Sequence, residues 1–138
     1  DARCVSDRTG DEVEFVEIMK PDRPSAYFAM WSHVRQLRSR PPGAASERSY
    51  HVETVSLNDL LAQHDAPRHI GYLSIDTEGS ELQILKAFDF AAWTIDVITV
   101  EHNYDNARRT AIHDLLSAHG FVNVHRDVSQ FDDWYVRA

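Results

Sequence analysis

The sequence is poor in features on which several protein classes depend. Its 138 residues contain one cysteine, Cys4, which excludes an internal disulfide and any zinc site built from several cysteines. No apolar run approaches the roughly 18 residues that a membrane-spanning helix requires, and the N-terminus shows no signal-peptide pattern. The five glycines form no G-x-G, and the P-loop, H-E-x-x-H and G-x-S-x-G patterns are absent as well. These absences exclude several enzyme classes and favour a reducing, cytoplasmic setting.

Positive charge is also scarce. The formal net charge is -8 at pH 7, so the overall field repels phosphate groups. Three arginines gather locally, at positions 35, 38 and 40, but this pattern is typical of a solvated helix face. We therefore expect neither a nucleic acid nor a membrane surface as a partner.

Strand-like and helix-like segments alternate along a chain whose hydrophobic content, 43%, is sufficient for one globular domain. Near the N-terminus we expect a hairpin of strands at 1–6 and 12–18, then a helix over 24–38 and a loop to residue 49. Further strands are expected at 50–55, 70–75, 97–100, 121–124 and 134–136, and helices at 56–64, 79–88 and 107–119. Apolar strands separated by amphipathic helices predict an α/β fold with a mainly parallel sheet covered on both faces.

Polar clusters follow two apolar strands of the predicted sheet. Asp76 comes directly after Ile75, and the tripeptide E-H-N at 101–103 comes directly after Val100. Ligands of open α/β sheets bind beyond the carboxyl ends of the strands. If the two strands are neighbours, both clusters lie on one rim.

The acidic stretch DTEGSE, residues 76–81, also has a purely structural interpretation. Glu78 and Glu81 would stabilise a helix N-terminus through its dipole, and Thr77 can cap that helix. This interpretation fits Glu81 best, because it lies a turn into the helix. Asp76 precedes the helix amides and has no basic neighbour in the sequence, which favours a functional role for it.

Two chemistries fit the rim, and spacing does not choose between them. Asp76, Glu101 and Asn103 offer oxygen ligands suited to a hard divalent cation. His102 instead suits a base with a pKa near its ordinary value. A loop whose polar residues satisfy local backbone groups is the structural alternative for this segment.

Five segments together resemble the C-terminal part of an FkbM-type methyltransferase, a family of S-adenosylmethionine-dependent enzymes. The segments are CVSDRTGDEVEF, VETVSLNDLL, IGYLSIDTEGSELQIL, ITVEHN and GFVNVHRDVSQFDDWYV. They cover nearly the whole chain apart from a variable helical insertion and loop at 20–49. The most specific element is D-x-E-G-x-E at 76–81, preceded by S-L-N-D-L-L.

The resemblance implies a Rossmann-like class I methyltransferase sheet with an antiparallel last strand. On that template this chain supplies strands three to seven, and the first strand–helix units are missing. The family binds most of the cofactor through a glycine-rich turn after the first strand and an acidic residue after the second, and neither is present here. We therefore expect residues 1–138 to be a single, truncated methyltransferase domain that binds the cofactor weakly by itself.

The resemblance also implies roles for individual residues. Cys4 and Val5 match the segment near which the adenine of S-adenosylmethionine lies, and Asp76 matches the acid at the reaction centre, where it adjoins the cofactor. Asp76 or His102 would take the proton of the acceptor as a catalytic base.

The acceptor site is expected to be lined by Glu78, Glu101 and Asn103. A divalent cation held by Asp76, Glu101 and Asn103 would offer a second route, because it lowers the pKa of a bound hydroxyl.

Three functions follow from these expectations. The first is methyl transfer from S-adenosylmethionine to a hydroxyl of a small molecule or sugar, with this chain as the C-terminal portion of the enzyme. The alternative is a non-catalytic binding or regulatory module that keeps the half-sheet, which the missing glycine-rich turn favours. The third is a metal-dependent hydrolase that uses the acidic rim. An incomplete sheet exposes unpaired strand groups, so a homo-oligomer is a further expected assembly.

Overall fold

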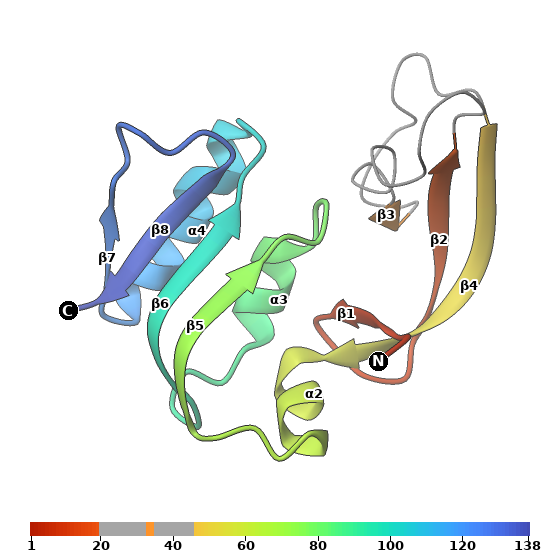
Figure 1. Cartoon of the computed structure of the whole chain (residues 1–138), viewed down its shortest axis with the longest axis horizontal. Helices are drawn as coiled ribbons and strands as arrows, with labels where there is room; N and C mark the ends of the chain where they lie inside the picture. The colour runs from red at the N-terminus through yellow and green to blue at the C-terminus, as the bar shows by residue number, and fades with distance from the viewer. Residues whose placement is uncertain (20–32, 35–45) are drawn as a thin grey trace.

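The computed structural model describes residues 1–19, 33–34 and 46–138, which form two four-stranded sheets and three helices (Figure 1). The first sheet contains, in spatial order, β1 (Cys4–Ser6), β4 (Ser46–Ser56), β2 (Glu12–Met19) and β3 (His33–Val34). The second contains β5 (His69–Ile75), β6 (Thr94–Glu101), β8 (Asp132–Arg137) and β7 (Phe121–Val124). The helices are α2 (Leu57–Gln63), α3 (Glu81–Ala87) and α4 (Asn106–Ala118). The predicted α/β class is thus confirmed.

β4 separates the two strands that the sequence predicts to form a hairpin. β1 pairs in parallel with residues 54–56 of β4, and β2 pairs antiparallel with residues 46–53. The predicted hairpin is therefore wrong. β4 is 11 residues long, which allows it to pair with both strands along different parts of its length. The turn that joins β1 to β2 is itself fixed on β4, because Gly10 N donates to Thr54 O over 3.0 Å.

The predicted insertion at 20–49 contributes to the first sheet at both of its described parts. His33–Val34 form β3 and pair antiparallel with β2, so the helix predicted over 24–38 is wrong at these two residues. Val34 is buried in the first sheet. Apolar residues at helical spacing can therefore also belong to a strand. Residues 46–49 belong to β4, while the rest of the insertion lies outside the described residues.

The second sheet mixes strand directions. β5 and β6 are parallel, and β8 runs antiparallel to both of its neighbours, β6 and β7. Three of its four strands, β5, β6 and β7, thus run in one direction, as expected for a mainly parallel sheet, and the short connection after β7 returns the chain so that the last strand, β8, runs against them. β5 and β6 end at the same edge, with Ile75 in register with Val100 (Figure 1).

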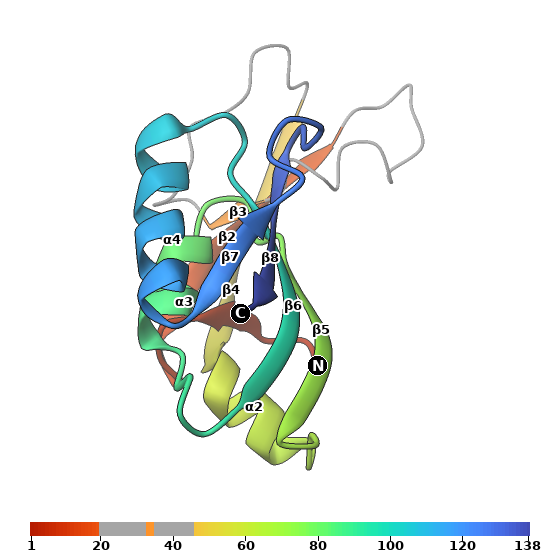
Figure 2. The same ribbon diagram turned by 90° about the vertical axis from the view of Figure 1, so that its left-hand side faces the viewer.

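Helices α3 and α4 lie together on one face of the second sheet (Figure 2). The buried core lies between this face and the helices, and it includes Ile75, Ile84, Leu85, Ile98, Val100, Ile112, Leu116 and Tyr135. The opposite face exposes Tyr72, Val122 and Trp134 at 56%, 49% and 43%. Helices on both faces, as predicted, are therefore not found in the part of the chain that the structure describes. No helix in that part is both long and apolar enough to cross a membrane.

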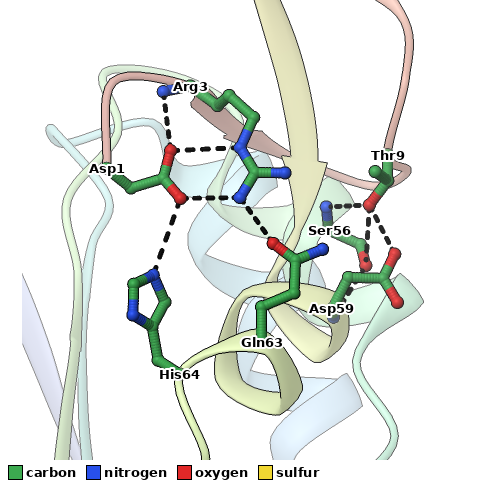
Figure 3. Close-up of polar contacts among 7 residues, drawn as sticks. All are labelled: Asp1, Arg3, Thr9, Ser56, Asp59, Gln63 and His64. Carbon is green, nitrogen blue, oxygen red and sulfur yellow. Dashed lines mark hydrogen bonds and ion pairs between the residues drawn. The ribbon is translucent and has the colours of Figure 1, made fainter.

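The short helix α2 begins where the sequence predicts. Ser56 occupies the N-cap position, and its hydroxyl accepts a hydrogen bond from the Asp59 amide over 3.1 Å. The Thr9 hydroxyl accepts from the Ser56 amide over 2.9 Å and donates to the Asp59 carboxylate (Figure 3). This hydrogen bond from Thr9 is the main reason why the pKa of Asp59 is lowered. The turn after β1 is thereby attached to the start of α2.

A second polar network attaches the N-terminus to the end of α2 (Figure 3). The Arg3 guanidinium donates to the Asp1 carboxylate and to the Gln63 side-chain oxygen, each over 2.6 Å. His64 Nε2 lies 3.6 Å from the Asp1 carboxylate. These contacts fix the residues before β1, and therefore also the position of Cys4.

Candidate functional site

Three carboxylates meet at the edge where β5 and β6 end. Asp76, Glu78 and Glu101 each place one carboxylate oxygen within 4.8 Å of the others. Asp76 is exposed, Glu78 is half-buried, and Glu101 is buried. The structure thus brings Asp76 and Glu101 together across the rim, and Asn103 lies two residues further along in the turn after β6.

A buried carboxylate organises the turn that carries Asp76 and Glu78. Glu81 is 0% exposed, and its Oε1 accepts hydrogen bonds from the Thr77 amide (3.0 Å), the Thr77 hydroxyl (3.1 Å) and the Gly79 amide (2.8 Å). Glu78 and Gly79 have positive φ values of 56° and 127°, which the extended or helical backbone does not allow. Glu81 therefore holds a tight turn together from within.

This geometry corrects the interpretation of Glu81 and Thr77 as helix-start residues. The Glu81 carboxylate bonds to the turn that precedes α3, so its role goes beyond interaction with the helix dipole. Ser80, rather than Thr77, occupies the N-cap position, and its side chain makes no capping hydrogen bond. The Ser80 hydroxyl instead donates to the Thr77 hydroxyl over 2.8 Å, inside the same turn.

Arg108 joins this turn to the start of α4. Its Nη1 lies 3.3 Å from Glu81 Oε2, and its Nη2 lies 3.7 Å from the Asp105 carboxylate. Asp105 is also the N-cap of α4 and accepts from the Arg108 amide over 3.1 Å. The turn after β5 and the turn after β6 are therefore held by one arginine.

His102 fixes the turn after β6. It is 2% exposed; its amide donates to Phe131 O over 2.8 Å, and its Nδ1 accepts from the Tyr104 amide over 3.0 Å. Asn103 and Tyr104 both have left-handed φ values, 46° and 59°. The buried ring thus stabilises two successive residues in a conformation that side chains rarely adopt.

A buried ion pair lies beside His102. The Asp133 carboxylate accepts two hydrogen bonds from Arg109, over 2.7 and 2.6 Å, and lies 4.0 Å from His102 Nε2. Burial lowers the pKa of His102, and it outweighs the opposing attraction of Asp133. Burial would raise the pKa of Asp133, but the hydrogen bonds and charge of Arg109 lower it overall. The surroundings therefore favour a neutral His102 beside an ionised Asp133.

The predicted cofactor residues, Cys4 and Val5, line a cavity of about 250 Å³ at the end of β1. Asp7 and Arg8 continue this wall, and Ser80 contributes from the turn that contains Asp76. Burial raises the pKa of the Cys4 thiol, so this thiol favours its neutral form. The cavity therefore connects the segment after β1 with the acidic turn.

Sequence reasoning missed the partners that hold these turns. Arg108 is 27 residues from Glu81, and Arg109 is 24 residues from Asp133. Neither pair has a local pattern that reveals it. The helix dipole favours positive charge at the C-terminal end of a helix. Two adjacent arginines at the start of a helix are therefore unusual, and they were the available signal.

The comparisons with known proteins agree with the motifs. A family model described as the methyltransferase FkbM domain matches residues 7–127 of the 138-residue chain. No curated protein and no solved structure gives a significant match. The matched range contains Asp76, Glu81, Glu101, His102 and Arg109, so both turns of the site fall inside it. The chain belongs to the FkbM methyltransferase domain family.

Proposed function

We propose that this chain forms the acceptor side of an S-adenosylmethionine-dependent O-methyltransferase. The family supports methyltransferase activity in general. The observation that carries the proposal is the meeting of Asp76, Glu78 and Glu101 at the edge where two parallel strands end. Ligands of open α/β sheets bind at such edges, and carboxylates there can orient an acceptor hydroxyl and remove its proton.

The strand arrangement supports the finer assignment. We assign β1 to the third strand of a Rossmann-like sheet and β5 to β8 to its fourth to seventh strands. The observed order β5-β6-β8-β7, with β8 antiparallel, fits this assignment. Among the described strands, β1 pairs only with β4 and β5 only with β6, so each has an edge that can accept a further strand. The strands that carry the glycine-rich turn and the ribose-binding acid would enter there.

When bound, S-adenosylmethionine supplies the electrophilic methyl group of its sulfonium. The residues of this chain would align the acceptor hydroxyl with that group and manage its proton. Asp76 is exposed at the rim and is our candidate for the proton acceptor. His102 is buried with Nδ1 already accepting a main-chain hydrogen bond, so a role in holding the rim turn fits its surroundings better than proton transfer. Cys4 and Val5, in the cavity beside Ser80, would contact the adenine.

A divalent cation is an alternative to direct proton removal. Three carboxylate oxygens within 4.8 Å of one another suit a hard cation, and Glu78 extends the set predicted from Asp76, Glu101 and Asn103. A cation there would lower the pKa of the acceptor hydroxyl. Methyl transfer after treatment with EDTA, with and without added Mg²⁺, separates the two routes.

The proposal is tested by calorimetric titration of S-adenosylmethionine into residues 1–138. We expect binding weaker than micromolar, that is, weaker than about -8 kcal/mol, because the five glycines form no G-x-G turn. Methyl transfer from labelled cofactor is then measured after the glycine-rich turn is supplied on an extended or a second polypeptide. Micromolar binding by the chain itself would contradict the proposal that cofactor binding depends on a glycine-rich turn outside residues 1–138. A persistent lack of methyl transfer would favour the non-catalytic binding module.

A further inference from the structure

Two exposed aromatic rings contact each other at the same rim. Tyr104 is 61% exposed and Phe131 is 52% exposed, and their ring centroids are 5.4 Å apart. They come from different loops, the one after β6 and the one before β8, and Figure 1 shows both loops at the end of the sheet where β6 terminates. Single exposed apolar side chains are normal, but a contacting pair of large rings beside a candidate site is a common feature of ligand contacts.

The backbone fixes this aromatic pair. His102 N donates to Phe131 O over 2.8 Å, which joins the two loops that carry the rings. Tyr104 N donates to His102 Nδ1 over 3.0 Å, and Asp105 N donates to His102 O over 2.8 Å. The His102 and Tyr104 rings are 5.9 Å apart in an edge-to-face arrangement. The exposed position of Tyr104 is thus set by a buried, hydrogen-bonded residue, as expected for a preformed surface.

Three carboxylates share the rim with the pair, and Arg126 lies in the same loop as Phe131. Glu101 directly precedes His102 and shares the rim with Asp76 and Glu78. The nearest arginines of α4 already have carboxylate partners, because Arg108 contacts Glu81 and Arg109 binds Asp133. The formal charge of the whole chain, -8, has the same sign. A phosphate or carboxylate on the ligand would therefore be repelled, whereas hydroxyl groups can donate to the rim oxygens.

We propose that Tyr104 and Phe131 are the platform on which the ring of the acceptor lies, and that this acceptor is an uncharged hydroxyl compound with a flat apolar face. The inference rests on the proposed function, because it specifies the substrate class of the same site. The apolar ring face would pack on the aromatic pair, and a hydroxyl at the ring edge would reach the rim carboxylates. A pyranose and a phenol share this chemistry, so both are probes.

The experiment uses residues 1–138 without cofactor, and binding is followed by NMR of the labelled aromatic side chains. The probes are methyl β-D-glucopyranoside and 4-methylphenol, each compared with its anionic counterpart, the methyl glucuronide and 4-hydroxybenzoate. We expect saturable shifts of Tyr104 and Phe131 with at least one neutral probe, and about tenfold weaker binding of its anionic counterpart, because one carboxylate a few ångströms away has an effect of this order. The neutral probe that binds more tightly shows whether the acceptor resembles a pyranose or a phenol.

The variants are Tyr104→Asn, which suits a left-handed φ, and Phe131→Ala; each should weaken binding of the neutral probe at least about fivefold. Tyr72→Ala is the matched control, because Tyr72 is also exposed, at 56%, but lies on the open sheet face. Melting curves verify that each variant is folded. Equal binding by Tyr104→Asn and the parent chain, preference for the anionic probe, or no binding of either neutral probe would each overturn the inference. Since no cofactor is present, a failure of methyl transfer would leave this result unaffected.

Discussion

Substitution of Glu81 by glutamine tests whether one buried carboxylate organises the site. Glu81 accepts three hydrogen bonds through Oε1 and pairs with Arg108 through Oε2. Glutamine keeps the shape and one accepting oxygen, but it removes the charge and presents amide hydrogens toward the Arg108 guanidinium. Hydrogen bonds to charged groups contribute about 1.5–3 kcal/mol each and neutral ones about 0.5–1.5 kcal/mol, so weakening three of them should lower the unfolding free energy by about 2–4 kcal/mol.

The assay is urea unfolding followed by circular dichroism at pH 7, with the free energies obtained by linear extrapolation. Glu53→Gln is the control, because Glu53 is exposed on β4 and its substitution should stay within about 0.5 kcal/mol. Amide NMR provides a local measure, since the Thr77 and Gly79 amides should exchange faster with solvent in Glu81→Gln.

The reasoning would be refuted if Glu81→Gln and Glu53→Gln unfolded with the same free energy. A loss below about 1 kcal/mol without a change at Thr77 and Gly79 would restore the helix-dipole interpretation of Glu81. A large loss with unchanged turn amides would place the effect in the contact with Arg108.

Three further predictions follow. In a form of the protein that transfers methyl groups, Asp76→Asn should lower turnover about 10²- to 10⁴-fold with little change in melting temperature, and equal turnover would remove Asp76 from the reaction. Since the folded state lowers the pKa of His102, the contribution of the neutral ring to the unfolding free energy should be fully present above the unfolded pKa of about 6.5 and should be lost as the pH falls toward the folded pKa. In a pH series of urea unfolding curves, His102→Gln should reduce this dependence of the unfolding free energy on pH. An unchanged dependence would contradict a neutral, buried His102. Ser56→Ala should cost about 0.5–2 kcal/mol in the same unfolding assay through loss of the α2 cap, whereas a change below 0.3 kcal/mol would mean that Thr9 compensates.

Local patterns predicted much of the second sheet. The apolar runs that end at Ile75 and Val100 correspond to β5 and β6, and α2 and α4 begin and end within one residue of the helices expected at 56–64 and 107–119. These features depend on neighbouring residues and on the periodicity of burial, both of which a single sequence contains. The sequence predicted that Asp76 and Glu101 lie on one rim only if their strands are neighbours, and the structure supplies that condition, because β5 and β6 are parallel neighbours.

Long-range pairing set the limit of these predictions. The sequence shows two alternating strands near the N-terminus, but it does not show that β4 lies between them. It likewise shows an acidic residue at position 81, but not that this side chain is fully buried and contacts Arg108. A charged residue in a first helical turn is usually solvated, so its burial depends on a partner that the chain brings near only on folding.

The two adjacent arginines of α4 have a mechanical consequence. Arg108 is attached to the turn after β5 through Glu81, and Arg109 is attached to the start of β8 through Asp133. A helix is stiff along its axis, so a small shift of α4 against the sheet would displace both attachments as one rigid body. A ligand that moves this helix would thus shift the turn that carries Asp76 together with the start of β8, so the position of α4 alone would determine how far the two attachments move.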